Sequence, residues 1–307
     1  MRTKQQLTDD IRRDRRAVLV VNARSRRGRK LYEDAHARLL AAGFTVLGSY
    51  AVDRDLEESL AEALALGPDL LVAGGGDGTI STAGRMLAHR DVALGLLPLG
   101  TTNNFARTVG IPPDLDAAIA TLTDGKVIDV DLGVAGDMPF TNHVGVGLSA
   151  EIMISAPRRL KRVVGRIAYP ITALGLLTRH RPLTVTVRAD GREIVYRTHQ
   201  VYVANGGFHA GRPITADAGA DDRLLVAYPV GGGTRWELLR ETARNVLTGH
   251  RRTLREQPFL AVGELFLQTD RPTRTEVDGE PCGETPLRVA VDPNALRIMA
   301  AADSPDH

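Results

Sequence analysis

Cysteine and aromatic residues are scarce in this chain of 307 residues. Cys282 is the single cysteine, which excludes an intramolecular disulfide and a zinc site built from several cysteines. Phe, Trp and Tyr together make up 4% of the chain, whereas apolar residues as a group reach 43% and charged residues 25%. This mixture is ordinary for a folded globular protein and excludes a disordered, collagen-like or fibrous chain. The lack of a disulfide framework is compatible with a reducing, cytoplasmic setting.

Long apolar runs are also missing. The first one, Ala17 to Val21, is 5 residues long, whereas a secretory signal needs roughly 7–15 apolar residues. The run from Ile167 to Leu177 has 11 residues and contains Pro170, whereas a helix that crosses a bilayer needs about 20. We therefore expect a chain without a signal or a membrane span, located in the cytoplasm.

No charge sign dominates, because 39 Lys and Arg residues face 37 Asp and Glu residues. The balance gives no electrostatic argument for a nucleic-acid partner. Basic residues gather in two segments, the one before Leu31 and the one between Glu151 and Arg181. The second segment contains seven Lys or Arg residues and a single acidic residue. A basic amphipathic helix of this kind is typical of elements that dock on anionic membrane surfaces. The alternatives are a solvated helix face and, for the N-terminal residues, a loose tail.

The first half of the chain alternates short apolar runs with helical spacings, which favours a parallel sheet with crossover helices. Strands are predicted over residues 17–21, 44–50, 69–73, 92–97 and 127–132. Helices are predicted between them, from residue 31 to the stop at Gly43, over 55–66 and over 114–122. The sequence predicts an α/β domain over residues 12–130.

Beyond residue 131, strand-like runs are separated by Gly, Asp and Pro turns. They cover residues 184–188, 193–204, 224–229, 264–269 and 287–291. Two helical stretches, residues 151–178 and 236–248, interrupt them. We predict a β-rich second domain over residues 131–300, and we also consider a return of its last strand to the first domain.

A glycine loop, Gly74-Gly75-Gly76-Asp77-Gly78-Thr79, stands between a predicted strand and a predicted helix. Glycines there let backbone N–H groups approach phosphates, and a helix N-terminus favours anions. The loop lacks the Lys-Ser/Thr ending of a P-loop and is not a dinucleotide fingerprint. Asp77 would repel phosphates unless a metal or a donor compensated it, which points to phosphoryl transfer. The alternative is a tight strand-to-helix turn.

A second polar segment, LPLGTTNNFAR from Leu97 to Arg107, follows the next predicted strand. Its Thr and Asn side chains should lie at the carboxyl edge of the parallel sheet, where such folds bind ligands. Taken alone, the segment could be a helix N-cap by Thr102 or Asn103. Beside the glycine loop, it favours a shared nucleotide cleft.

Together, GGGDGT and LPLGTTNNFAR resemble the diacylglycerol-kinase catalytic domain shared by bacterial lipid kinases, sphingosine kinases and ceramide kinases. The resemblance covers about residues 17–298 and includes Asn142 with Gly145 and Gly147, Asn205-Gly206 and the segment VDGE that ends at Glu280. It implies an α/β domain of the NAD-kinase and diacylglycerol-kinase type and a β-rich domain. These would enclose ATP and Mg²⁺ in a cleft, and the γ-phosphate would pass to a hydroxyl of a membrane lipid.

The resemblance also implies roles for individual residues. Those matched to nucleotide binding are Asn22, Ser49, Gly75, Gly76, Asp77, Gly78, Thr79, Ile80, Ser81, Thr101 and Asn103. Ala23 replaces the family's Pro, and the match around Ser49 is poor. Glu280 matches the general base, which would accept the proton of the lipid hydroxyl, and Asp77 is the second catalytic candidate. Without the resemblance, Asp278-Gly279 would be a hairpin turn with a solvated Glu280.

A metal site is implied at Asp222, with the main-chain oxygens of Gly219 and Leu224 as further ligands of Mg²⁺. Arg223 stands where the family has Gly, and an Asp-rich hairpin turn is the competing interpretation. The Mg²⁺ that bridges nucleotide phosphates would be a separate ion. The histidines show no metal-ligand spacing, so we interpret them as structural; they include His89, His143, His180 and His209.

The leading hypothesis is an ATP- and Mg²⁺-dependent kinase that acts on a membrane lipid at the inner face of the membrane. An NAD kinase and a non-catalytic nucleotide- or lipid-binding relative are the alternatives. The sequence leaves open whether the acceptor is diacylglycerol, phosphatidylglycerol or a sphingoid base. It also leaves open whether the protein forms a homodimer.

Overall fold

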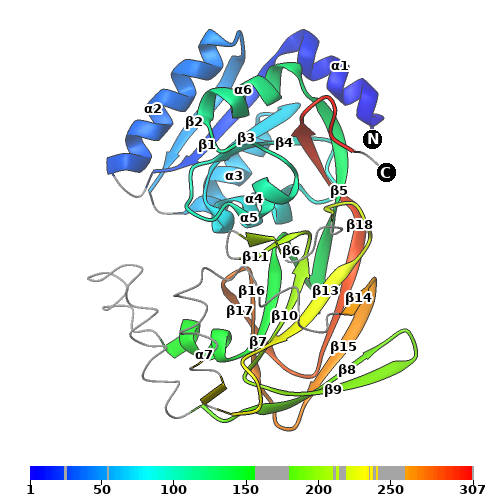
Figure 1. Cartoon of the computed structure of the whole chain (residues 1–307). Helices are drawn as coiled ribbons and strands as arrows, with labels where there is room; N and C mark the ends of the chain where they lie inside the picture. The colour runs from blue at the N-terminus through cyan, green and yellow to red at the C-terminus, as the bar shows by residue number, and fades with distance from the viewer. Residues whose placement is uncertain are drawn as a thin grey trace.

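The computed structural model describes residues 1–23, 26–53, 55–155, 180–209, 212–213, 219–234, 236–237, 240 and 260–305, with no side-chain description at 26, 27, 154, 155, 209, 212 and 213. Figure 1 shows two parts, one above the other. Helices surround a sheet in the upper part, whereas strands fill most of the lower part.

The upper part is built on four parallel strands in the order β2-β1-β3-β4. These strands are β1 (Arg16–Asn22), β2 (Thr45–Val52), β3 (Leu70–Gly75) and β4 (Ala93–Pro98). The helices are α1 (Lys4–Asp14), α2 (Arg26–Ala41), α3 (Leu56–Ala65), α4 (Asp77–Leu87), α5 (Asn104–Thr108) and α6 (Leu115–Asp124). All six residues of β3 and of β4 are buried, which is why these strands read as unbroken apolar runs in the sequence.

The lower part packs two layers of mostly antiparallel strands. One layer is a six-stranded sheet, β14-β13-β10-β7-β16-β17, made of β7 (His143–Gly147), β10 (Gln200–Asn205), β13 (Leu225–Val230), β14 (Leu260–Val262), β16 (Arg274–Val277) and β17 (Glu280–Glu284). The other contains β6 (Met138–Phe140), β8 (Leu183–Ala189), β9 (Arg192–Thr198) and β15 (Glu264–Thr269). Helix α7 (Leu148–Ser155) follows β7, and β11 (Phe208–His209) pairs with β12 (Arg212–Pro213).

Two long strands, β5 (Lys126–Ala135) and β18 (Leu287–Ala300), run from one part into the other (Figure 1). They pair with each other along most of their length, and near its end β18 pairs in parallel with β4, where Ile298 faces Leu94. The upper sheet and one layer of the lower part are therefore a single hydrogen-bonded sheet. This continuity fixes the carboxyl edge of the parallel strands above the six-stranded sheet.

The architecture confirms the predicted fold class, an α/β part with a parallel sheet followed by a β-rich part. The single strand predicted over 193–204 is wrong, because β9 ends at Thr198 and β10 begins at Gln200. The Thr198 hydroxyl donates to the carbonyls of Gln200 and Val230 and bends the chain from one sheet into the other. Most of the predicted helices at 151–178 and 236–248 lie outside the described residues.

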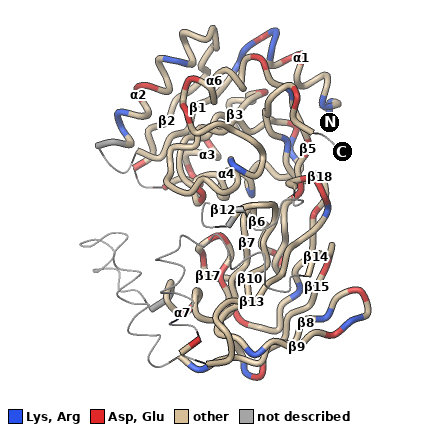
Figure 2. The backbone as a smooth tube through the Cα atoms, in the orientation of Figure 1, with Lys and Arg blue, Asp and Glu red and all other residues tan. Residues whose placement is uncertain are grey.

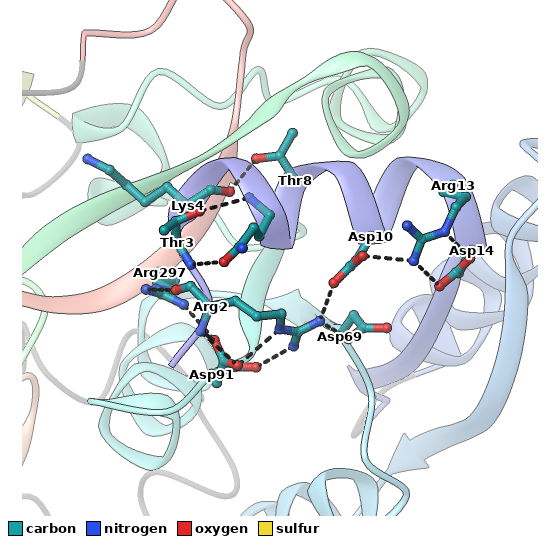
Figure 3. A network of polar contacts seen from close by, with 11 residues as sticks. Arg2, Thr3, Lys4, Thr8, Asp10, Arg13, Asp14, Asp69, Asp91 and Arg297 are labelled. Atoms are coloured by element: carbon teal, nitrogen blue, oxygen red, sulfur yellow. Dashed lines mark hydrogen bonds and ion pairs between the residues drawn. The ribbon is translucent and has the colours of Figure 1, made fainter.

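The N-terminal residues form helix α1, where the sequence suggested a loose tail or a membrane-docking segment. Leu7 and Ile11 are buried against the upper core, and Thr3 caps the helix with Gln6 in a capping box. Figure 3 shows how Arg2 fastens this end of the chain. Its guanidinium contacts Asp91 at 3.0 Å, Asp69 at 2.6 Å and Asp10 at 3.0 Å. Arg2 therefore forms ion pairs with other parts of the folded chain.

Replacing Arg2 with Ala is expected to lower the free energy of unfolding by about 1–3 kcal/mol, because several charge-assisted hydrogen bonds are lost. Burial raises the pKa of Asp91, but hydrogen bonds from Arg2 outweigh it and hold this pKa below its ordinary value. The stabilisation is thus present above pH ~4 and is lost as the pH falls through the folded-state pKa. Urea unfolding at pH 7 and pH 3.5 measures both effects.

Arg188 provides the control, since its ion pair with Glu193 is exposed on the β8–β9 hairpin. Arg188→Ala should change the stability by less than about 1 kcal/mol. Equal losses for the two variants at pH 7 would show that the Arg2 cluster contributes no more than a surface pair.

Basic and acidic positions are interspersed along α1 and at the tip of the β8–β9 hairpin (Figure 2). In the part of the chain that the structure describes, none of the helices combines the length and the apolar character needed to cross a bilayer.

Candidate active site

The two polar loops found in the sequence lie side by side at the carboxyl edge of the parallel sheet. Strand β3 ends at Gly75 and α4 begins at Asp77, while β4 ends at Pro98 and leads to Gly100. A Cβ atom on Gly100 would collide with the backbone of Gly76. Glycine is therefore required where the backbones of the two loops touch.

Asp77 joins these loops through both of its carboxylate oxygens. Oδ2 accepts a hydrogen bond of 2.6 Å from the Thr102 hydroxyl, and Oδ1 accepts one of 2.6 Å from the backbone N–H of Asn104. Short bonds to an ionised acceptor are among the stronger hydrogen bonds in proteins. These two donors offset the negative charge of Asp77. The sequence had raised the question of this charge, because an acidic side chain in the glycine loop would repel phosphates.

A cavity of about 700 Å³ opens between the glycine loop and the start of α3, and we call it the glycine-loop cavity. Its lining includes seven of the predicted site residues, namely Asn22, Gly76, Asp77, Gly78, Thr79, Thr101 and Glu280. Asn22 ends β1, and its side-chain amide donates to the Thr79 hydroxyl over 3.2 Å. The folding of β1, α4 and the second loop thus brings these distant residues together.

Other predicted residues lie behind this lining. Asn103 supports the second loop, since its Oδ1 accepts from the N–H of Gly100 and its Nδ2 donates to the carbonyls of Pro98 and Gly100. Ser81 donates to Asp278 of the lower part. Gly75 and Ile80 are buried. None of these four predicted residues is among the described residues that line the cavity.

Ser49 is not brought to the cavity. It pairs with Leu19 in the middle of β2, three positions before the strand end that faces Asn22. Its hydroxyl hydrogen-bonds to Tyr32 of α2 at 2.8 Å. Its predicted contact with a nucleotide is therefore unsupported by this geometry.

The β16–β17 hairpin brings Glu280 to the same edge. Its two turn residues, Asp278 and Gly279, have φ values of 48° and 86°, which suit the Asp-Gly pair of a type I′ turn. The Asp278 carboxylate accepts hydrogen bonds from the backbone N–H groups of Thr141, Asn142 and His143, from the Thr141 hydroxyl and from the Ser81 hydroxyl of α4. Asp278 therefore holds the hairpin against β7 and against α4, the helix that follows the glycine loop. The sequence had suggested only a simple turn here.

Glu280 itself lies at the rim of the glycine-loop cavity. Its side chain is 50% exposed and contacts the Arg85 guanidinium of α4 at 3.0 Å. The same guanidinium lies 3.6 Å from Glu57 of α3. Arg85 thus orients the Glu280 carboxylate across the domain boundary, while leaving it open to a ligand.

We expect Asp278→Ala to lower the free energy of unfolding by about 2–4 kcal/mol, because buried N–H groups lose their acceptor. Asp190→Ala is a matched control, because Asp190-Gly191 forms the same left-handed turn in the exposed β8–β9 hairpin. Both variants place Ala at positive φ, so their difference reports the carboxylate contacts alone. Thermal or urea unfolding measures the stability of both variants. Equal losses of stability in the two would show that Asp278 is only a turn residue.

A second cavity, of about 420 Å³, lies on the other side of the hairpin turn beside α7, and we call it the α7 cavity. Asp77 and Thr102 line both cavities. Ile152 and Met153 of α7 give it an apolar wall. The two cavities therefore adjoin where Asp77 of the glycine loop accepts a hydrogen bond from Thr102 of the second loop.

Most residues that line the α7 cavity were not predicted as site residues from the sequence, and Glu276 and His143 are the titratable pair among them. Glu276 is only 3% exposed, and its Oε1 lies 3.3 Å from Nε2 of His143. The histidine was interpreted as structural. The available signal was Gly145, since a glycine inside a strand often marks a close approach of other groups.

Glu276 and His143 shift each other's titration. Burial raises the pKa of Glu276, but the hydrogen bond and charge of His143 outweigh it and hold this pKa below its ordinary value. Burial lowers the pKa of His143, yet Glu276, Asp278 and Asp77 together raise it above its ordinary value. The short contact and the surrounding carboxylates therefore favour an ionised Glu276 beside a protonated His143.

The predicted metal loop shows Asp222 in a hydrogen-bonding role. Its carboxylate accepts from the N–H groups of Gly219 at 2.8 Å and Leu224 at 2.9 Å. Arg223 adopts a left-handed φ of 58°, in place of the family's Gly, and its N–H donates to Asp131. Among the described residues, no three His, Cys, Asp or Glu side chains gather as metal ligands. Mg²⁺ binding at Asp222 remains a prediction.

Comparison with known proteins identifies the family of the chain. The family model described as the diacylglycerol kinase catalytic domain matches residues 16–135. The one described as the YegS C-terminal NAD kinase beta sandwich-like domain matches residues 142–300. The chain therefore belongs to the diacylglycerol kinase family and is an enzyme of the lipid-kinase class, as the two loops predicted.

Relatives share most of the chain. It is 29% identical over 305 residues to a probable lipid kinase YegS-like protein of Pseudomonas fluorescens, which covers 95% of this chain and 97% of the relative. It is 31% identical over 270 residues to a protein of the same description from Pseudomonas aeruginosa, over 82% of this chain and 83% of that one. A diacylglycerol kinase of Bacillus subtilis is 33% identical over 186 residues, 58% of this chain and 61% of its own.

The fold is also found in a solved structure. The crystal structure of a putative diacylglycerol kinase from Bacillus anthracis matches with a TM-score of 0.72 at 20% identity. The match covers 95% of this chain and 99% of that chain. It supports the fold class of both parts.

Proposed function

We propose that the protein transfers the γ-phosphate of ATP, with Mg²⁺, to a hydroxyl of diacylglycerol or a related membrane lipid. The observation that carries the proposal is the meeting of two cavities at Asp77 and Thr102. One cavity is walled by glycine-loop backbone and polar side chains, and the other has an apolar wall on α7. Direct transfer requires both reactants side by side in this manner.

The glycine-loop cavity suits the phosphates of a nucleotide. It lies at the N-terminus of α4, an eleven-residue helix whose first N–H groups favour anions. A Cβ at Gly78 would meet no heavy atom within 4 Å, so the backbone there faces open space. Thr79 and Thr101 add hydroxyl groups to the lining.

The residues present also fit a Mg²⁺ ion that is held largely by the nucleotide. Mg²⁺ usually takes one or two carboxylates together with substrate phosphates, and Asp77 is a carboxylate in the glycine-loop cavity. When bound, the ion would neutralise charge that develops on the transferred phosphoryl group. Asp77 would remain tied to Thr102 and Asn104, which keeps its carboxylate in a fixed place.

The role proposed for Glu280 follows from its position. The carboxylate stands at the end of a turn that separates the two cavities and is oriented by Arg85. A carboxylate there can take the proton of an acceptor hydroxyl as that oxygen attacks phosphorus. The lipid chains would extend along the apolar wall of the α7 cavity.

Contact with an anionic membrane surface is part of the proposal. It rests on the sequence between Glu151 and Arg181, where seven cations stand against one anion. Residues 156–179 of this segment lie outside the described residues.

The activity can be tested with γ-labelled ATP, Mg²⁺ and a lipid extract, with NAD present as a competing acceptor. The proposal predicts label in the organic phase that disappears when Mg²⁺ is chelated. Label in NAD would identify an NAD kinase, and label in neither acceptor would support a non-catalytic relative.

A further inference from the structure

Trp236, the only tryptophan of the chain, is the most exposed large apolar side chain among those that the structure describes. Its exposed fraction is 81%. A single exposed apolar residue is common on protein surfaces and has no meaning by itself. The position of Trp236 in the fold and the charges around it give its exposure a meaning.

The backbone that carries Trp236 is held by a capping box over residues 234–237. The N–H of Glu237 donates to the Thr234 hydroxyl over 3.2 Å, and the N–H of Thr234 donates to Oε2 of Glu237 over 3.0 Å. A Cβ atom on Gly232 would collide with the Glu237 side chain, so the preceding backbone also lies close. These contacts fix the turn from which the indole extends into solvent.

This capped turn lies at the end of the lower part that points away from the parallel sheet (Figure 1). Strand β13 ends at Val230, which pairs with Gln200 at the start of β10. Gln200 also pairs with Gly147, the last residue of β7 before α7. A Cβ on Gly233 would lie 3.6 Å from the side chain of Arg197 near the end of β9. The ends of four strands therefore surround the capped turn.

Helix α7 connects this end of the lower part with the α7 cavity. The N–H of Leu148, the first residue of the helix, donates over 3.1 Å to the carbonyl of His199, next to the start of β10. Further along the helix, Ile152 and Met153 form the apolar wall of the cavity. A bilayer against this end would therefore lie beside the helix that walls the proposed acceptor site.

The chain carries a surplus of basic residues at this end. Exposed described cations there are Arg181, Arg197, Arg271 and Arg274, with the acidic Asp270 and Glu284 among them. Residues 156–179, which directly precede His180, contain six Lys or Arg residues and no acidic residue. Residues 238–259, which directly follow Glu237, contain five Arg residues and two acidic residues. Most residues of these two segments lie outside the described ones, and their composition favours an anionic surface.

We propose that Trp236 is an interfacial anchor that enters the head-group region of an anionic bilayer and docks the α7 end of the lower part on the membrane. The inference rests on the membrane contact in the proposed function, and it assigns that contact a face and an anchoring residue. Tryptophan gathers at membrane–water interfaces, where its ring contacts apolar groups and its N–H finds a hydrogen-bond partner. The basic residues nearby attract anionic lipid.

The first experiment uses the fluorescence of the wild-type chain, since all tryptophan emission comes from Trp236. Vesicles contain phosphatidylcholine and phosphatidylglycerol in equal parts, and sedimentation measures the bound fraction. On binding, the emission maximum should move to shorter wavelength, and acyl chains brominated near the head group should quench it, because the indole leaves water. Bound protein with unchanged, unquenched emission would overturn the inference and leave the proposed membrane contact intact. No binding would overturn both.

The second experiment compares variants on the same vesicles. Trp236→Ala is expected to weaken binding by about tenfold or more, because the apolar area of the ring no longer leaves water. Trp236→Tyr should recover most of the affinity, since tyrosine is also an interfacial residue. Leu40→Ala is the matched control, because Leu40 is 50% exposed on α2 of the upper part, and it should bind normally. Normal binding by Trp236→Ala would contradict the inference.

Vesicles of phosphatidylcholine alone test the contribution of charge. The wild-type chain should bind them at least about tenfold more weakly than the anionic vesicles, because the basic residues then lack their partner. Equal binding to both kinds of vesicle would contradict the anionic surface that the inference names.

Kinase assays separate this inference from the proposed function. On diacylglycerol in uncharged detergent micelles, Trp236→Ala should have the wild-type rate, whereas on anionic vesicles its rate should fall together with its binding. An equal fall in both assays would show that Trp236 supports the fold or the reaction and does not act in docking; thermal unfolding decides between these two. A wild-type chain that is inactive in both assays, yet bound with a quenched Trp236, would overturn the kinase proposal alone.

Discussion

Replacing Glu280 with Gln is expected to lower turnover by about 10²–10⁴-fold, the usual contribution of a general base. The substitution keeps the size of the side chain and a hydrogen-bonding group that can face Arg85, but it removes the proton acceptor. Stability should change by no more than about 0.5 kcal/mol, because the side chain is half exposed. Initial rates, ATP affinity and thermal unfolding are measured on the same preparation.

The pattern expected for Glu280→Gln is a fall in kcat with little change in ATP affinity, since the carboxylate would act on the acceptor hydroxyl. Glu284→Gln, on the same strand, should have a normal rate. A loss of less than threefold in Glu280→Gln would contradict the assignment, and the base would then have to be another group in the two cavities.

Asp77→Asn is expected to lower turnover by about 10²–10³-fold, on the scale of losing one fixed electrostatic group in an active site. Asp77 accepts hydrogen bonds of 2.6 Å from the Thr102 hydroxyl and from the backbone N–H of Asn104. An amide can accept only through its oxygen, so one of these donors loses its partner and the loops shift. We therefore expect a stability loss of about 1–3 kcal/mol as well.

Thr102→Val separates the two roles of Asp77. The substitution removes the hydroxyl that donates a hydrogen bond to Asp77, and it keeps the Asp77 carboxylate. If Asp77 acts on the nucleotide and its metal, Thr102→Val should lose stability comparably yet retain much more activity than Asp77→Asn. If activity falls in proportion to stability in both variants, Asp77 only holds the two loops together.

The parts of the fold that follow from local patterns could be predicted. Strands β1, β3 and β4 are buried on both faces, so their apolar runs were visible in the sequence. The glycine loop and the LPLGTTNNFAR segment each follow one of these strands, and the carboxyl edge of a parallel sheet brings such segments together. Asn22, Asp77 and Thr101 consequently line one cavity.

Long-range contacts account for what the sequence did not reveal. The Asp278 carboxylate is held by Ser81 and by the backbone of residues 141–143, more than a hundred positions away. Glu276 and His143 meet because β16 pairs with β7. Helix α1 carries few apolar residues, and its anchor, Arg2, finds Asp69 and Asp91 only in the folded chain. No local spacing encodes these pairings.

Direct transfer between two bound reactants is tested by the initial rate at which label passes from γ-labelled ATP to diacylglycerol, with the concentrations of both varied. Two adjoining cavities imply that both reactants are bound when phosphate moves. Direct transfer predicts label in the lipid and reciprocal plots that intersect. Parallel plots, which indicate a phosphorylated enzyme intermediate, or label released only as inorganic phosphate would contradict it.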